Sequence, residues 1–114
     1  MAFDEKLADR IRRVLADRRD VEERKMFGGL TFMVRGHMCV GIVDRDLMAR
    51  IGPDASEEAL ARPHVRAMDF TGRPLKGLVY VASGGVRSEA ALRQWIARGV
   101  EFVDSLPAKK KRER

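Results

Sequence analysis

The sequence predicts a two-layer α+β fold in which three helices flank an antiparallel sheet of about five strands. Apolar residues recur at helical spacing near both ends of the chain, whereas β-branched, aromatic and methionine residues dominate much of the stretch between them. The expected order is a helix, three or four strands, a helix, two strands and a helix. Strands that follow one another through short turns favour an antiparallel sheet with the helices gathered on one face.

The first part of the chain is expected to form a helix and then the first strands. Residues 3–18 predict an amphipathic helix, because charged side chains lie opposite an apolar face made of Phe3, Leu7, Ile11, Val14 and Leu15. Between residues 21 and 51 the pattern is that of strands, and turn residues interrupt it at 28–29, 35–36 and 44–46. This spacing predicts three or four antiparallel strands.

A short second helix is expected over residues 54–61. Gly52-Pro53 ends the preceding strand, and Asp54 and Glu57 have the spacing of a capping box. The helix should end before Pro63, whose ring disfavours helical geometry at the residue before it.

The last part of the chain predicts a second hairpin and a third helix. Residues 68–70 and 75–81 are the expected strands, joined by the turn at 71–74. Ser88 is the expected N-cap of the helix. Its apolar face consists of Leu92, Trp95, Ile96, Gly99, Phe102, Val103 and Leu106.

Composition and charge indicate one globular domain. The 114 residues are 45% apolar and 35% charged, and this length suits a single core. Residues 109–114, KKKRER, carry five basic side chains and one acidic one, a net +4 of the total +6, which leaves +2 for the rest. We therefore predict a domain at residues 1–107 and a basic, disordered tail at 108–114.

The sequence also predicts a cytoplasmic protein without a membrane anchor. No apolar stretch approaches the roughly 20 residues that span a bilayer, and the charged N-terminus lacks the apolar core of a signal peptide. The single cysteine, Cys39, excludes an intramolecular disulfide.

Four stretches carry a family resemblance: KMFGGLTFMVRGHMCVGI (25–42), LMARIG (47–52), MDFTGRPLKGLVYV (68–81) and EAALRQWIARGVEFVDSLP (89–107). Their best markers are Met26-Phe27-Gly28-Gly29, Gly36, Tyr80 and Trp95. Together they resemble the N-terminal domain of the TfoX/Sxy family of bacterial competence regulators, over nearly the whole chain up to Pro107.

The resemblance implies a two-layer fold similar to that of type III secretion chaperones. It also implies a role in regulating gene expression for DNA uptake and not an enzymatic activity. We expect no catalytic residue, cofactor or metal. Full-length regulators of this family carry a second, helical C-terminal domain, so we expect a stand-alone N-terminal domain here.

His37 and Cys39 are the first candidate site. Two residues apart on a strand, they should share a face and could bind a metal or combine a thiolate with a base. A zinc site needs three or four ligands, however, and His64 has no ligand-spaced companion. If Arg35-Gly36 forms a two-residue turn, Cys39 should be a small buried apolar residue, which is the favoured interpretation.

Two further features suggest anion binding. Gly84-Gly85 precedes the third helix and would allow a phosphate to approach its first amides, although a plain turn is favoured because no P-loop or dinucleotide motif is present. A basic set could line one edge of the second hairpin: Arg62, Arg66, Arg73, Lys76 and Arg87. Within it, Arg73, Lys76 and Arg87 are the candidate phosphate contacts.

The favoured interaction surface is the first hairpin, because both of its alternating sets of residues are apolar. One set contains Leu30, Phe32 and Val34, and the other contains Met33, Met38, Val40 and Ile42. A sheet that is apolar on both faces needs cover on both. The second set is therefore the candidate surface for a protein partner, including a second copy of the chain. The alternative is that a helix and the long hairpin loops shield both faces within one monomer.

These observations predict a non-enzymatic regulatory protein that acts through protein contacts. Nucleic-acid binding through the basic tail and surface arginines is the alternative, and it is not favoured because one tryptophan and one tyrosine offer little to stack on bases. No small-molecule substrate is inferred.

Overall fold

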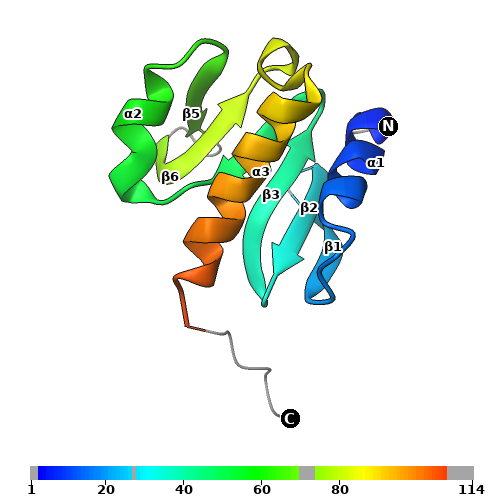
Figure 1. Ribbon diagram of the computed structural model, residues 1–114. Coiled ribbons are helices and arrows are strands. Elements are labelled where there is room, and N and C mark those ends of the chain that lie inside the picture. Colours follow the sequence, from blue (N-terminus) through cyan, green and yellow to red (C-terminus); the bar gives the residue numbers. More distant parts are fainter. Residues whose placement is uncertain (1–2, 27, 70–73, 108–114) are drawn as a thin grey trace.

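A computed structural model describes residues 3–26, 28–69 and 74–107 of the chain (Figure 1). The helices are α1 (Glu5–Val14), α2 (Ser56–Leu60) and α3 (Glu89–Asp104), with 3-10 turns η1 (Pro53–Ala55) and η2 (Ser83–Val86). The strands are β1 (Val21–Met26), β2 (Gly29–Val34), β3 (His37–Val43), β4 (Asp46–Arg50), β5 (Val65–Asp69) and β6 (Pro74–Val81).

The strands form one antiparallel sheet in the order β1-β2-β3-β4-β6-β5. The predicted α+β class is confirmed, with six strands in the described residues where the sequence predicts about five. The charged segment VEERKM makes the difference, because it pairs along its whole length with β2 as an outer strand.

One face of the sheet and the helices enclose the hydrophobic core. Helices α1 and α3 lie across this face (Figure 1), and Ala59 of α2 joins the same cluster of buried side chains. The helices contribute Leu7, Ala8, Ile11, Leu92, Trp95, Ile96 and Val103 to this core. No helix in the described part of the chain is long and apolar enough to cross a membrane.

The helix ends agree with the sequence only in part. Ser88 caps α3 as predicted, because its Oγ accepts a hydrogen bond from the Ala91 N–H at 3.0 Å. Helix α1 is shorter than the predicted 3–18, because the Asp4 carboxylate caps its start and Leu15 is already its C-cap. The predicted capping box at Asp54 and Glu57 is wrong: Pro53 starts a 3-10 turn, which a proline's fixed φ favours, and α2 begins only after it.

The first hairpin turns at Arg35-Gly36 as predicted. Both residues have positive φ, 55° and 82°, and Val34 pairs with His37 across them. The pairing of β2 with β3 then shifts, because Met33 pairs with Met38 while Phe32 pairs with Val40. Cys39 is thus an extra residue in β3, that is, a β-bulge.

The bulge corrects the predicted faces of the hairpin. Val40 and Ile42 pair with Phe32 and Leu30, lie in the core and are 0% and 1% exposed. They cannot form the predicted interaction surface of the folded chain, because the extra residue turns them toward the helices.

The methionines of the hairpin remain on the opposite face. Met33 pairs with Met38 there, and Met48 of β4 pairs with Gly41 and Tyr80. Met33 and Met48 are nevertheless only 7% and 1% exposed, while Met38 is half-buried. This face therefore offers a partner less apolar surface than the sequence pattern suggests.

Candidate functional site: a groove around Phe102

The predicted basic set does not form one cluster among the described side chains. Arg62 pairs with Glu58, and Arg66 pairs with Asp46 at 2.6 Å and stacks on Tyr80. Arg87 is exposed ahead of α3. Arg73 and the side chain of Lys76 lie outside the described residues.

Gly84 and Gly85 allow close packing within the chain. They form the 3-10 turn η2, and a Cβ on Gly84 would lie 2.7 Å from His64 Cε1. A Cβ on Gly85 would lie 2.6 Å from Val81 Cγ1. The glycine pair lies in a turn, as predicted, and leaves room for His64 and Val81, a packing contact that the sequence does not predict.

His37 and Cys39 have separate surroundings. Cys39 is fully buried as predicted, and burial raises the pKa of its thiol to about 12. It lies against α3, where a Cβ on Gly99 would be 3.2 Å from Cys39 Sγ. The His37 Nε2 instead lies 2.7 Å from the Pro107 carbonyl oxygen.

The hairpin turn holds the end of α3. Arg35 Nη1 donates hydrogen bonds to the carbonyl oxygens of Val103 at 3.1 Å and Leu106 at 3.0 Å. Val103 lies in the last turn of α3 and also accepts from the Leu106 N–H at 3.0 Å, whereas Leu106 follows the helix, where intrahelical donors are lacking. The histidine and arginine that stood out in the sequence therefore fix the C-terminal end of α3 on the sheet.

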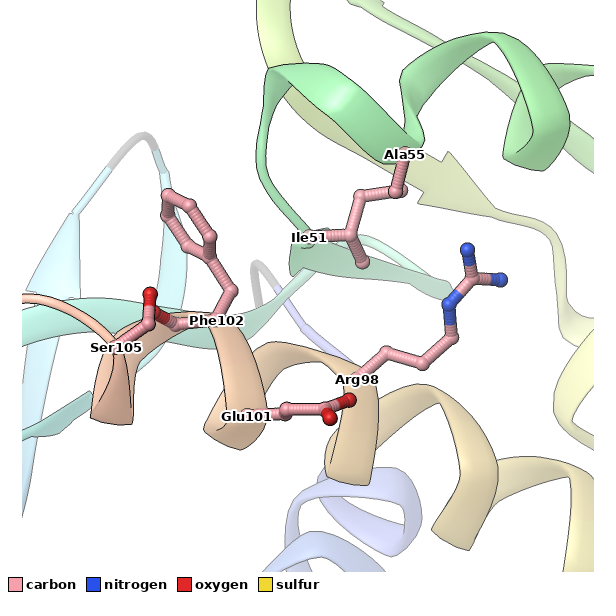
Figure 2. Close-up of a pocket in the computed structure, with 6 residues that line it drawn as sticks. All are labelled: Ile51, Ala55, Arg98, Glu101, Phe102 and Ser105. Atoms are coloured by element: carbon pink, nitrogen blue, oxygen red, sulfur yellow. The ribbon is translucent and has the colours of Figure 1, made fainter.

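Two shallow hollows lie on either side of the Phe102 side chain, and we call the pair the Phe102 groove. The first, of about 350 Å³, is lined by Ile51, Ala55, Arg98, Glu101, Phe102 and Ser105. Figure 2 shows three α3 side chains and Ser105, the C-cap of α3, on one side and Ile51 and Ala55 on the other. The second, of about 420 Å³, is lined by Met38, Arg50, Gly52, Pro53, Gly77, Leu78 and Phe102.

Gly52 positions the aromatic ring. Its φ of 92° and ψ of 150° belong to a region that is almost restricted to glycine, and a Cβ there would lie 2.6 Å from Phe102 Cδ1. Gly77 supports the same segment, because its carbonyl oxygen accepts from the N–H groups of Ile51 at 2.8 Å and Gly52 at 3.2 Å. The ring thus rests directly on the backbone after β4.

Arg50 adds a positive charge to the groove. Its guanidinium lies 5.5 Å from the centroid of the Phe102 ring, and its Nη1 donates to the Met38 carbonyl oxygen at 3.3 Å. Within the described residues no carboxylate lies within ion-pair distance of Arg50. The Arg50 side chain lines the second hollow.

Arg98, on the other side of the ring, is paired with Glu58, which it shares with Arg62. Arg98 and Arg62 each donate to the Glu58 carboxylate at 2.6 Å, and both guanidinium groups face the Trp95 ring. The hydrogen bonds from Arg62 and Arg98 lower the pKa of Glu58. Arg98 Nη1 is buried without a hydrogen-bond partner among the described residues, so this wall of the groove holds an unsatisfied donor.

The sequence does not single out this groove. Phe102 is predicted on the apolar face of the last helix, and Gly52-Pro53 is predicted only as the end of a strand. Only the tertiary packing of α3 against the end of β4 brings them together. The local sequence pattern at the groove is an arginine followed closely by Gly-Pro, and this pattern is too common to indicate a binding site.

A comparison with models of known protein families finds a match. The sequence model of the TfoX N-terminal domain family matches residues 13–103, which is most of the chain. No curated protein and no solved structure matches the chain. The matched range runs from α1 to α3 and includes the first hairpin, the glycine under Phe102 and Phe102 itself. The chain therefore belongs to the TfoX N-terminal domain family.

Proposed function

We propose that this chain is a non-enzymatic regulatory domain that binds a protein partner in the Phe102 groove and acts in the regulation of genes for DNA uptake. The regulatory part of the proposal rests on the family, which is associated with competence regulation. The binding part rests on one observation: Arg50, without a carboxylate partner among the described residues, stacks on an aromatic ring between two hollows.

The chemistry of the groove suggests the kind of partner. Arginine and aromatic side chains are enriched among the residues that contribute most to protein interfaces. Ile51, Leu78 and Phe102 supply apolar surface, and Arg50 supplies the charge. A protein segment with an apolar side chain next to an acidic one fits this surface, because its carboxylate would pair with Arg50 while its apolar group enters a hollow.

The groove is also held rigidly, which favours specific binding. The α3 wall is fixed at its end by Arg35, and the opposite wall is hydrogen-bonded to Gly77. Little conformational entropy is then lost when a partner binds.

The test is a charge reversal in the source organism. We expect Arg50→Glu to lower transcript levels of the DNA-uptake genes as far as deletion of the gene does. Arg93→Glu is the matched control, because this exposed α3 arginine carries the same charge and lies outside the groove. Thermal unfolding of both purified variants must resemble that of the wild type.

A photo-crosslinking residue identifies the partner. Placed at Glu101 in the groove, it should form a product with one protein, and Arg50→Glu should abolish that product. Placed at Asp17, an exposed position outside the groove lining, it should not. Wild-type transcript levels in Arg50→Glu would contradict the proposal. If the purified chain binds duplex DNA and the Arg50→Glu variant binds it equally well, the nucleic-acid alternative is favoured.

A further inference from the structure

The β1 strand leaves one edge of the sheet open. Among the strands of the described residues it pairs with β2 alone and forms the outer strand beyond it (Figure 1). The Arg35 N–H donates to the Asp20 carbonyl oxygen at 3.0 Å. Asp20 directly precedes β1, and its pairing with Arg35 continues the register in which Val21 pairs with Val34. Because hydrogen-bonded pairs alternate in antiparallel sheets, the main-chain groups of Val21, Glu23 and Lys25 point away from the sheet.

The charges along this edge have an order that complements itself. The strand reads Val-Glu-Glu-Arg-Lys-Met, so two acids precede two bases, and all four charged residues are exposed. An antiparallel copy reverses this order. If Glu23 lies on the two-fold axis, Glu22 stands opposite Arg24 of the second copy, and Arg24 stands opposite Glu22 of that copy.

Each Glu23 side chain on the axis is already paired within its own copy, with Arg12, which also binds Asp9. Arg12 Nε and Nη2 donate to the Glu23 carboxylate at 2.7 and 2.9 Å. These hydrogen bonds lower the pKa of Glu23. Lys25 of the second copy would lie diagonally across from Glu23, within reach of a long side chain. The like charges on the axis are therefore surrounded by cations.

We propose that β1 pairs with β1 of a second copy of this chain, about a two-fold axis through Glu23, to give one continuous antiparallel sheet. Each copy contributes the six strands of its described residues, and a two-fold axis perpendicular to the sheet leaves both sets of helices on the same face. The outward N–H and C=O groups of Val21, Glu23 and Lys25 then pair with those of the second copy.

The same charges oppose other pairings. Charged side chains on an edge strand normally prevent association with unrelated edges, and a different register of β1 on itself loses the contacts between Glu22 and Arg24. A strand-to-strand contact buries a small area, so the dimer should form reversibly and depend on concentration. This surface is separate from the Phe102 groove, to which β1 contributes no lining residue.

Sedimentation velocity on the full chain over a micromolar to millimolar series tests the proposal. The wild type should shift from the monomer mass toward twice that mass. Arg24→Glu places acids opposite acids and should abolish the shift, whereas the swap Glu22→Arg with Arg24→Glu restores complementarity and should restore it. Arg93→Glu, outside β1, is the control for a change of net charge and should dimerise like the wild type.

A backbone variant and a cysteine scan test the geometry. Lys25→Pro removes an N–H that points away from β2, so the chain should stay folded and remain monomeric. Glu23→Cys should form a disulfide-linked dimer on oxidation and Arg24→Cys should not, because only residue 23 meets its own copy. The native Cys39 is buried and does not interfere.

A wild type that stays monomeric throughout, or a charge swap that fails to restore the dimer, would overturn the proposal. Preferential crosslinking through Arg24→Cys would overturn the register. Arg50→Glu should leave the dimer intact, so a failure here is distinguishable from a failure of the proposed groove function.

Discussion

Gly52 decides where the aromatic ring of the groove can lie. The residue combines a positive φ with a contact that leaves no room for a side chain, since the ring of Phe102 occupies the place of its Cβ. Both properties belong to one residue, so a substitution acts on the backbone and on the groove together.

We predict that Gly52→Ala destabilises the chain more than Gly28→Ala does. Gly28 also has a positive φ, 75°, but a Cβ there would have nothing within 4 Å. Gly28→Ala should therefore cost only the backbone strain, about 1–2 kcal/mol of unfolding free energy. Gly52→Ala adds a clash with Phe102 and should cost roughly 1–3 kcal/mol more.

Urea denaturation of the two variants beside the wild type measures this difference. Equal losses at the two positions would show that Phe102 moves aside without cost, and the ring would then not be fixed on the Gly52 backbone.

Some residue roles follow from the sequence and others do not. The Arg35-Gly36 turn follows from local spacing. Cys39 is buried as predicted, but as the extra residue of the bulge, because Phe32 pairs with Val40 and not with Cys39. The contact of His37 with Pro107 spans 70 positions of the chain, and no local pattern indicates it.

At the scale of elements, one extra residue decides which side chains of β3 meet the helices. Alternation along a strand assigns faces with a period of two, and a bulge breaks this period without a sequence signal. The prediction for Val40 and Ile42 failed for this reason, whereas the strand itself and its turn were predicted. Helix α3 fits over the bulge because Gly99 leaves room for Cys39.

The hairpin turn also anchors a distant helix, and this leads to a prediction for Arg35. Arg35→Asn keeps a residue that accepts the positive φ of the turn but removes the guanidinium that binds the Val103 and Leu106 carbonyls. We expect a loss of about 1–2 kcal/mol of unfolding free energy, since hydrogen bonds to a charged donor are lost.

Amide hydrogen exchange locates the effect of this variant. The amides of the last turn of α3 should exchange faster in Arg35→Asn, while those of β2 and β3 beside the turn should not. Arg93→Asn, on the exposed side of the same helix, is the control and should leave both regions unchanged. Unaltered exchange at the end of α3 would show that Arg35 does not anchor the helix.

At the scale of the whole molecule, the fold class was predictable and the groove was not. Periodicity and turn residues depend on neighbours in the sequence, so they indicate the helices, the hairpins and their antiparallel order. The sixth strand was less evident because β1 carries four charged residues in a row, as an outer strand with solvent on its edge can. The Phe102 groove arises where α3, β4 and β6 meet, and no single segment contains its pattern.

Arginine–carboxylate pairs join the elements across the surface of the molecule. Arg12 of α1 binds Glu23 of β1, Arg18 binds both Asp20 and Asp104 of α3, and Arg98 of α3 binds Glu58 of α2. Hydrogen bonds from the arginines lower the pKa values of Asp20, Glu23 and Glu58 in the folded chain. In the unfolded chain these carboxylates return to their ordinary values.

Stability should therefore decrease as the pH falls through the acidic range. Above the ordinary carboxylate pKa values, near 4, the pairs contribute fully to stability. Below these values the unfolded chain binds protons first and is favoured.

Glu23→Gln removes one pair, and because exposed pairs contribute little, it should cost less than about 1 kcal/mol of unfolding free energy at pH 7. The difference from the wild type should vanish at a pH well below 4, where Glu23 is protonated in both states of the wild type. Arg12→Gln removes the partner and should reduce the same pH-dependent difference, which urea denaturation at several pH values measures. A gap between wild type and Glu23→Gln that stays constant from neutral to acidic pH would show that the charge of Glu23 does not stabilise the contact between α1 and β1.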